Sequence, residues 1–481
     1  MNYDVIVVGA GLGGLTAGAK LAKEGKKVLV LEQHDRPGGC ATTFKRKDFT
    51  MEVGLHEMDG LHPRDIKTKV FTELGIFDRV EFIKVPEFYR FVNGRHDIVI
   101  PHDPEEAMQT LFAHFPKEEG GIRSYFDHLL NARRVVVESR GKPDRSVGEF
   151  LDEIIGDEDL KLVLLGNLGY YHDDPYSISW LYYLTAQGSY FGGGGGNFVR
   201  GGSQKLSNAL RDVIEAHGGR VSLHSKVMAI EMKDGLAGAV AYIHLKAGEK
   251  ERITVQSKEI IVNAAVPNLA SELLPEASGK SLSEAIKGHR IGASLLTVYF
   301  GFNNLLSEIG NKNYSTFIYD ESVRTQADIL PNNHSDFTTR SFTFVDYGMV
   351  DSGLAPKGKS VGAVCCIDYT KDWEGLGKEA YRKRKDEAVE AIIERCDRLI
   401  PGFRQAVAYV EVGTAKTVKR YTMNPEGAVY GFAQNPGKST DYLNALPENV
   451  HIASAWGKFG GGFSGAIYSG YMTAIDVLRK R

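Results

Sequence analysis

The chain has 481 residues, enough for several domains around a large buried core, so a small module is excluded. Lys and Arg total 58 against 61 Asp and Glu, and the formal net charge of -3 gives no reason to expect a nucleic acid partner. The 4 cysteines are too few for a disulfide framework, which favours a reducing, cytoplasmic location. No stretch reaches the ~18 uninterrupted apolar residues of a membrane-spanning helix, so any membrane contact is expected to be peripheral.

The N-terminal segment contains two apolar runs separated by a glycine-rich turn and a helical pattern. Residues 4–8 have the length of a buried strand, residues 9–14 read Gly-Ala-Gly-Leu-Gly-Gly, and a second buried strand at 26–31 ends at Glu32. A GxGxxG turn that follows a strand, opens a helix and is answered by an acid is typical of a dinucleotide-binding βαβ unit. The sequence therefore predicts a nucleotide site at the N-terminus.

Each residue of this motif has a physical role. Gly9 permits the tight turn, Gly11 lets the backbone approach a pyrophosphate, and Gly14, next to Gly13, lets helix and strand pack closely. The N–H groups of the helix N-terminus face the phosphates. Glu32 would accept hydrogen bonds from a ribose 2′-hydroxyl.

A Gly-Gly pair follows about six residues after the acid, and a short apolar segment then ends in Gly-Leu-His-Glu. Together with the nucleotide motif, this pattern resembles the amine-oxidase superfamily of flavoproteins, in particular phytoene desaturases, carotenoid isomerases and retinol saturases. The resemblance implies an FAD cofactor and backbone contacts to the flavin and its ribityl chain. The matching positions are Gly38, Gly39, Cys40, Gly54, Leu55 and His56.

The resemblance extends to two later blocks, residues 200–265 and 420–481. In the first block, Val227 matches a residue that lies against the adenine, and Ala264 belongs to a strand that closes this half of the flavin domain. In the second block a strand ends at Gly457, and Lys458 stands where many relatives carry an acid. A glycine-rich helix start then resembles the family's C-terminal flavin motif, with Ser464, Gly465 and Ala466 as the matching positions.

The implied fold class is α/β, with a Rossmann-like FAD-binding domain of the amine-oxidase type and an interleaved α+β substrate domain. The FAD-binding domain is expected to comprise residues 1–60, 197–270 and 420–481, and the substrate domain residues 61–196 and 271–419. Helical patterns predict helices at 64–74, 105–115 and 378–399. The five glycines at 192–196 predict a flexible loop, because such a run cannot form a regular element.

His56 and Glu57 are the candidate catalytic residues, since the segment from 53 to 57 is expected to end a strand beside the flavin. Imidazole is well suited to move protons near neutral pH, so His56 or Glu57 would supply or remove a proton. Alternatively, His56 only hydrogen-bonds the cofactor or a neighbouring backbone group. The histidines lack the spacing of metal ligands, and no metal is expected.

The resemblance implies an oxidoreductase that acts on C=C or C–C bonds of a polyene isoprenoid lipid, a carotenoid or retinoid, as a saturase, desaturase or isomerase. The electron donor or acceptor is left open. An aromatic stretch at 169–191 either lines a tunnel for this hydrophobic substrate or forms ordinary helix core. Two alternatives are a flavin amine oxidase, with Tyr430 as one of two aromatic residues facing the flavin, and a non-catalytic prenyl-lipid-binding protein. The latter would use the related fold of GDP-dissociation inhibitors, which lack a complete flavin fingerprint.

Overall fold

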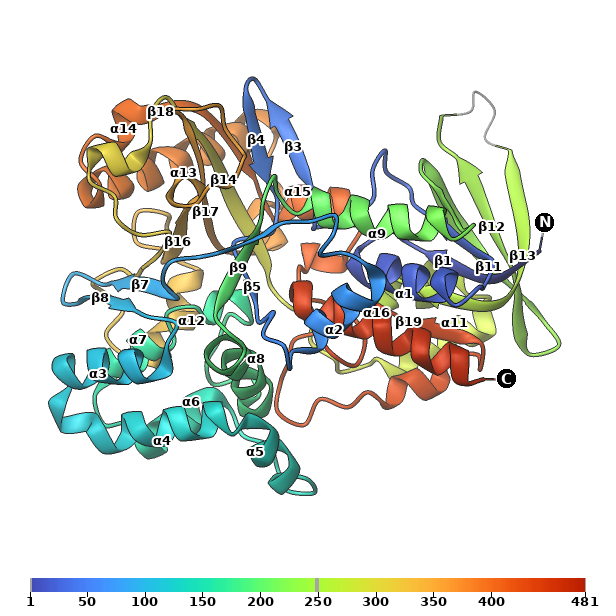
Figure 1. The fold of residues 1–481 in the computed structure, drawn as a ribbon, viewed down its shortest axis with the longest axis horizontal. Coiled ribbons are helices and arrows are strands. Elements are labelled where there is room, and N and C mark those ends of the chain that lie inside the picture. The colour runs from blue at the N-terminus through green and yellow to red at the C-terminus, as the bar shows by residue number, and fades with distance from the viewer. Residues whose placement is uncertain (1, 247–250, 481) are drawn as a thin grey trace.

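Two seven-stranded β-sheets and the helices that cover them organise the molecule (Figure 1). The computed structural model describes residues 2–246 and 251–480. Strands of the first sheet come from residues 2–31, 220–262 and 450–452, and strands of the second come from residues 89–100, 294–368 and 407–413. Each sheet is therefore assembled from segments that are far apart in the sequence.

The first sheet contains the predicted nucleotide-binding unit. Five of its strands are parallel, and two antiparallel strands extend it at one edge. The two N-terminal apolar runs form its central strands, which are buried on both faces as parallel strands usually are. The strands are β1 (Asn2–Val8), β2 (Val28–Leu31), β10 (Arg220–Ser222), β11 (Ser225–Lys233), β12 (Leu236–His244), β13 (Arg252–Val262) and β19 (Val450–Ile452).

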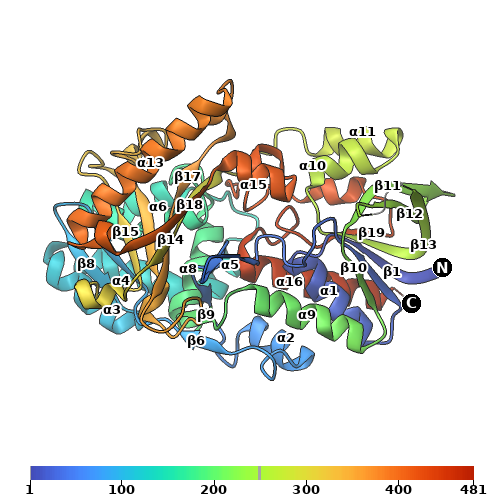
Figure 2. The same cartoon turned by 90° about the horizontal axis from the view of Figure 1, so that it is seen from above.

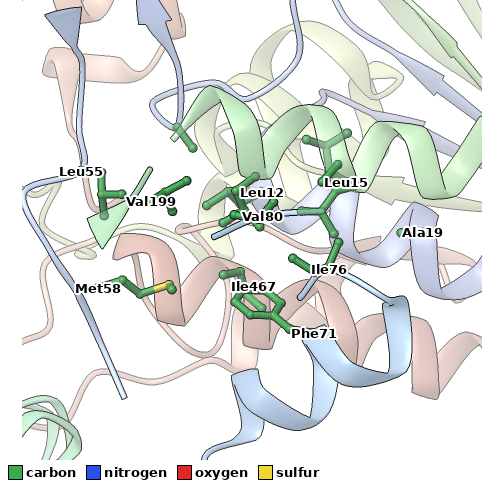
Figure 3. Packing of buried hydrophobic residues seen from close by; sticks show 14 of the residues in the cluster. Leu12, Leu15, Ala19, Leu55, Met58, Phe71, Ile76, Val80, Val199 and Ile467 are labelled. Carbon is green, nitrogen blue, oxygen red and sulfur yellow. The ribbon is translucent and has the colours of Figure 1, made fainter. Parts of the chain in front are cut away.

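Three helices lie side by side on this sheet, with α1 (Leu12–Lys23) between α9 (Gln204–Ala216) and α16 (Gly462–Arg479) (Figure 2). α1 and α16 can approach closely because Gly470 has no side chain. A Cβ at this position would overlap the carbonyl oxygen of Gly13. The helix α2 (Ile66–Leu74) covers the other side of α16. Figure 3 shows the apolar core between α1, α2 and α16, in which Leu15 and Ile467 are fully buried.

The second sheet is antiparallel except where β15 pairs with β7. One face packs against α13 (Lys378–Leu399) and α14 (Phe403–Ala406), and α13 has the predicted bounds. Its strands are β7 (Tyr89–Val92), β8 (Asp97–Ile100), β14 (Ser294–Phe302), β15 (Ser315–Ile318), β16 (Phe342–Asp346), β17 (Ser360–Asp368) and β18 (Val407–Gly413).

A helical lobe packs against the β7 and β8 end of this sheet. It is held together by an apolar cluster that includes Phe91, Phe126 and Trp180. Its helices are α3 (Pro104–His114), α4 (Glu119–Leu130), α5 (Ala132–Glu138), α6 (Val147–Ile154), α7 (Glu158–Leu164) and α8 (Trp180–Gly192). Among the described residues, no helix combines the length and the apolar composition needed to cross a bilayer.

Short elements connect these parts. The strand β9 (Gly196–Val199) pairs with β5 (Met58–Asp59) and β6 (Phe82–Lys84), and β3 (Thr43–Arg46) forms a hairpin with β4 (Phe49–Glu52). The remaining α-helices of the described residues are α10 (Val266–Asn268), α11 (Glu276–Ala285), α12 (Ile329–Asn333) and α15 (Ala415–Thr422).

Two local expectations are wrong. The glycine run is not a loop throughout, because α8 continues to Gly192 and Gly196 begins β9, where it pairs with Asp59. The strand expected to run to residue 57 ends at Glu52. The carboxylate of Glu52 accepts hydrogen bonds from the backbone N–H groups of Gly54 (3.2 Å) and Leu55 (3.1 Å), which turns the chain there.

Candidate active site

A cavity of about 1170 Å³ lies between the two sheets and is lined by residues from both. Its wall includes the turn after β1, residues 31–44, the first turn of α16, one face of α8 and part of β14. One end is formed by the nucleotide motif, and the other end carries mainly aromatic and apolar side chains. The cavity thus brings the site predicted for a cofactor together with aromatic and apolar side chains of the second sheet and of α8.

The glycine turn forms one end of the cavity. Gly11 is the N-cap of α1, and no described side chain caps the first turn, so its N–H groups can bind phosphate. A Cβ at Gly11 would lie 2.5 Å from the side-chain nitrogen of Asn263. Gly13 and Gly14 also have a packing role, since a Cβ at either would overlap a backbone carbonyl oxygen, that of Ala453 or of Gly9.

Glu32 lies at the end of β2, where its buried carboxylate borders the cavity. Oε2 accepts a hydrogen bond from the N–H of Ala10 (2.7 Å), and Oε1 accepts one from the N–H of His34 (2.9 Å). These two bonds fix the carboxylate next to the glycine turn. A ribose hydroxyl could donate to its remaining lone pairs.

Most of the predicted cofactor-binding residues line this cavity. Leu55 does not, because its side chain lies in the core under α1, and Gly457 packs against Ile452. Gly13 and Gly14 also lie outside the wall. The predicted residues that line it are Gly9, Gly11, Glu32, Gly38, Gly39, Cys40, Gly54, His56, Val227, Ala264, Ser464, Gly465 and Ala466.

His56 lies on the cavity wall, and a hydrogen bond to Tyr170 orients its ring. Nδ1 shares a hydrogen bond of 2.8 Å with the hydroxyl of Tyr170, and the two rings meet edge to face. Burial lowers the pKa of His56 to about 4. The imidazole is therefore neutral at pH 7 and is oriented by Tyr170.

Glu57 also lines the cavity but has a different electrostatic character. Its Oε2 atom is buried and has no hydrogen-bond partner among the described residues. Burial raises the pKa of Glu57 well above its ordinary value, and the nearby carboxylates of Glu87 and Asp59 raise it further. These surroundings disfavour the ionised form of Glu57 and favour a protonated carboxyl group at the cavity wall.

The aromatic stretch at 169–191 contributes side chains both to the cavity wall and to the core of the helical lobe. Tyr170, Tyr171 and Tyr182 line the cavity. Trp180 faces away from it and stacks on Phe150 at a ring-centroid distance of 3.6 Å in the core of the helical lobe. One side of α8 thus forms the cavity wall, and the other side forms helix core.

Tyr430 borders the cavity beside the start of α16. The residues next to it are Gly461 and Gly462, and a Cβ at Gly461 would lie 2.7 Å from the Cα of Tyr430. None of the aromatic ring pairs within the described residues includes Tyr430. Other aromatic residues of the same cavity wall include Tyr170, Tyr182 and Phe459.

Sequence reasoning missed Glu52, which links three parts of the site. Besides Gly54 and Leu55, its carboxylate accepts hydrogen bonds from the N–H (2.7 Å) and the Oγ–H (2.6 Å) of Ser203, just before α9. Burial raises the pKa of Glu52 to about 7. The sequence signal that could have identified Glu52 is an acidic residue between the apolar residues Met51 and Val53.

Side chains from the second sheet fix the backbone of the same segment. The hydroxyl of Tyr347 donates to the carbonyl of Leu55 (3.0 Å), and that of Tyr314 donates to the carbonyl of His56. Both tyrosines are buried. No local sequence signal identifies them, since their partners lie more than 250 positions away in the chain.

A buried charged cluster completes the wall near α16. Lys67 pairs with Asp59 (3.1 Å) and Asp65 (3.0 Å), and Asp59 accepts further hydrogen bonds from the hydroxyls of Ser189 and Ser464. These contacts join α2, β5, α8 and α16. The first turn of α16 is thereby held at a fixed place beside the cavity.

Fold and site together define a protein with a Rossmann-like nucleotide motif that opens into one large cavity between two sheets. Residues 12–478 match the family model described as flavin containing amine oxidoreductase. The chain therefore belongs to the flavin-containing amine oxidoreductase family, and its cofactor is FAD.

Two relatives align over most of the chain. An all-trans-retinol 13,14-reductase of Danio rerio is 26% identical and aligns over 92% of this chain and 80% of its own length. A chloroplastic prolycopene isomerase of Daucus carota is 25% identical over 93% of this chain and 74% of its own length.

Solved structures have the same fold. An oxidoreductase from Methanosarcina mazei superposes with a TM-score of 0.68 at 17% identity and covers 100% of both chains. A triple mutant of putrescine oxidase gives a TM-score of 0.70 at 16% identity and covers 100% of this chain and 99% of its own. The predicted fold class is confirmed.

The residues present fit FAD. The first turn of α1, which has no side-chain cap, suits a pyrophosphate, and the fixed carboxylate of Glu32 suits a ribose. The first turn of α16 borders the same cavity, where its N–H groups suit an electron-rich ring atom. No side chain fills the space between these groups, since together they line one cavity.

Proposed function

We propose that this FAD-dependent oxidoreductase acts on C=C or C–C bonds of a polyene isoprenoid lipid, a carotenoid or retinoid, by saturation, desaturation or isomerisation. The observation that carries the proposal is the single cavity, which joins the FAD-binding residues to a wall of tyrosines and apolar side chains. The cavity, of about 1170 Å³, includes the space next to the FAD-binding residues and is also lined by Tyr170, Tyr171 and Tyr182. The names of two relatives, a retinol reductase and a prolycopene isomerase, support a polyene substrate.

The site residues divide into a cofactor group and a catalytic pair. FAD, when bound, supplies a two-electron donor or acceptor. Glu57 holds a proton at the cavity wall and can donate it to a substrate carbon or take it back. His56 is neutral and tied to Tyr170, so its part is to position the wall beside Glu57. We assign proton transfer to Glu57 rather than to His56.

The interleaved domains are part of this proposal. We infer that the FAD-binding domain comprises residues 1–60, 197–270 and 420–481, and the substrate domain residues 61–196 and 271–419. The two sheets support this division, because their strands come from the two sets of segments. The hydrophobic substrate would reach the cavity from a membrane surface, with the protein bound there peripherally.

The two alternatives are weaker than this proposal. A flavin amine oxidase has less support from the two relatives named above, since they are a retinol reductase and a prolycopene isomerase. A non-catalytic lipid-binding protein would not need the complete set of Gly9, Gly11 and Glu32.

The test offers the purified, FAD-loaded protein a retinoid, a carotenoid and a primary amine, each under anaerobic conditions with oxidised or reduced flavin. We expect one polyene to gain two hydrogens, lose two or change isomer, as measured by chromatography and mass spectrometry. The variant Gly11→Val should lack flavin and leave the polyenes unchanged. Oxidation of the amine with no change in any polyene would refute the proposal.

A further inference from the structure

We propose that residues 130–145, which comprise the end of α4, helix α5 and the turn after it, form a docking surface for an anionic lipid bilayer. This segment is called the α5 surface below. It rests on the proposed function, because a polyene lipid is supplied from membranes. Figure 1 shows α5 at the end of the helical lobe, far from the first sheet.

The α5 surface exposes apolar side chains. Leu130 is 45% exposed and Val137 is 48% exposed, and α5 has no buried residue. Arg133 and Arg134 stand between these two positions in the sequence, and Asn131 separates the end of α4 from α5. Together they line a shallow hollow of about 470 Å³. Apolar side chains beside arginines are the pattern of helices that lie in a membrane interface.

The charge of this surface is opposite to that of the chain. Residues 130–145 contain five basic and two acidic side chains, whereas the whole chain has a net charge of -3. Within the part of the chain that the structure describes, no carboxylate lies within 4.0 Å of Arg133, Arg140 or Lys142. These cations are available for lipid phosphates, and such attraction adds to the burial of the apolar side chains.

The α5 surface is directly connected to the cavity through α8. A Cβ at Gly188 of α8 would lie 3.3 Å from the Cβ of Ala132, so the two helices are in close contact. On its other side α8 presents Tyr182, Ala186 and Ser189 to the cavity. Thr185 of α8 is exposed and also borders the cavity, so the cavity reaches the surface at this helix, as it does at Tyr421 and Met423. A bilayer against α5 would therefore place lipid beside the opening at α8.

A second copy of the chain is the less suitable occupant. A two-fold interface would set the arginines of one α5 surface against those of the other, and like charges would repel. The exposed apolar part is also small, with Leu130 and Val137 as its strongly exposed members. An anionic bilayer satisfies both the charge and the apolar side chains.

The test is flotation of the FAD-loaded protein with phosphatidylcholine vesicles that contain or lack phosphatidylglycerol. We expect binding that requires phosphatidylglycerol and weakens at high salt. The double variant Arg133→Glu/Val137→Ser should reduce the vesicle-bound fraction roughly 10-fold or more, since it removes a cation and an inserted side chain. The matched control Lys233→Glu/Leu236→Ser changes equally exposed residues at the β11–β12 turn and should float like the wild type.

Activity measurements separate this inference from the proposed function. With polyene in detergent micelles, the Arg133→Glu/Val137→Ser variant should turn over at the wild-type rate, and with polyene in vesicles it should be slowed. Equal flotation of this variant and the wild type, or no flotation of the wild type, would overturn the docking surface. If flotation behaves as expected but no polyene is converted even in micelles, the proposed function fails while the docking surface stands.

Discussion

Glu57 and Asp59 lie two residues apart on the same wall of the cavity, yet their pKa values move in opposite directions. Burial raises the pKa of Glu57, with Glu87 and Asp59 adding to the effect. Burial also favours neutral Asp59, but Lys67 and two serine hydroxyls outweigh it and lower the pKa of Asp59. A pair of carboxyl groups whose environments separate their pKa values in this way is typical of acid–base sites. The surroundings thus favour the protonated form of Glu57 and the ionised form of Asp59.

The substitution Glu57→Gln tests this assignment. Glutamine keeps the shape but holds no transferable proton, so we expect normal FAD content and a loss of roughly 10²-fold or more in the single-turnover rate. His56→Ala should reduce the rate less, because His56 positions the wall. The measurement is rapid-mixing absorbance of the flavin with the polyene. A Glu57→Gln variant with the wild-type single-turnover rate would move proton transfer to His56 or to solvent.

At the scale of elements, the strand β9 brings the glycine run against Glu57. A methyl group at Gly196 would overlap Oε2 of Glu57, so only glycine leaves room for this carboxyl group. At Gly192, by contrast, an added Cβ would meet nothing within 4 Å. The sequence could not distinguish these two positions, because the difference depends on β9 pairing with β5 and β6.

The pair Gly196→Ala and Gly192→Ala therefore makes a matched test. Gly196→Ala should displace the carboxyl of Glu57, lower the free energy of unfolding by about 1–3 kcal/mol and slow turnover while FAD stays bound. Gly192→Ala should leave activity unchanged and the unfolding free energy equal or slightly higher. Urea unfolding and single-turnover kinetics measure both effects. Equal behaviour of the two variants would contradict a role for Gly196 in holding Glu57.

The elements that the sequence predicted well are those determined by local patterns. The run of strand, glycine turn, helix and strand at the N-terminus is local, and so is the amphipathic helix α13 with its stop at Pro401. The end of β4 was missed, because the side chain of Glu52 rather than a turn residue ends the strand. The expected FAD-binding positions came from the family resemblance. The resemblance could not distinguish residues that line the cavity from residues that pack in the core, such as Gly13; that distinction needed the structure.

At the scale of the whole molecule, the cavity requires both sheets. Tyr314 and Tyr347 come from the second sheet, yet they hold the backbone of Leu55 and His56 at the edge of the first. Such pairings arise only when distant segments meet, so no spacing in the sequence reveals them. The same assembly buries His102 near the ring of Phe88 (5.8 Å between centroids), outside the cavity.

This burial predicts how stability depends on pH. Burial, with a smaller effect of Lys84, lowers the pKa of His102 to about 4, and burial lowers that of His56 to about 4 as well, against about 6.5 in an unfolded chain. Between pH 4 and 6.5 the unfolded state binds more protons, so the free energy of unfolding rises with pH across this window. Each histidine should contribute about 1–3 kcal/mol, which is present above pH 6.5 and lost as the pH falls towards 4.

The variant His102→Phe isolates one of these contributions without touching the cavity. A phenyl ring can pack against Phe88 and takes up no proton, so the stability of the variant should fall less steeply between pH 6.5 and 4. Urea unfolding at half-unit pH steps measures the slope, and His114→Phe, at an exposed position, is the control. A slope equal to that of the wild type would mean that His102 becomes protonated without cost in the folded protein. Because His102 lies outside the cavity, the result should be the same with and without FAD.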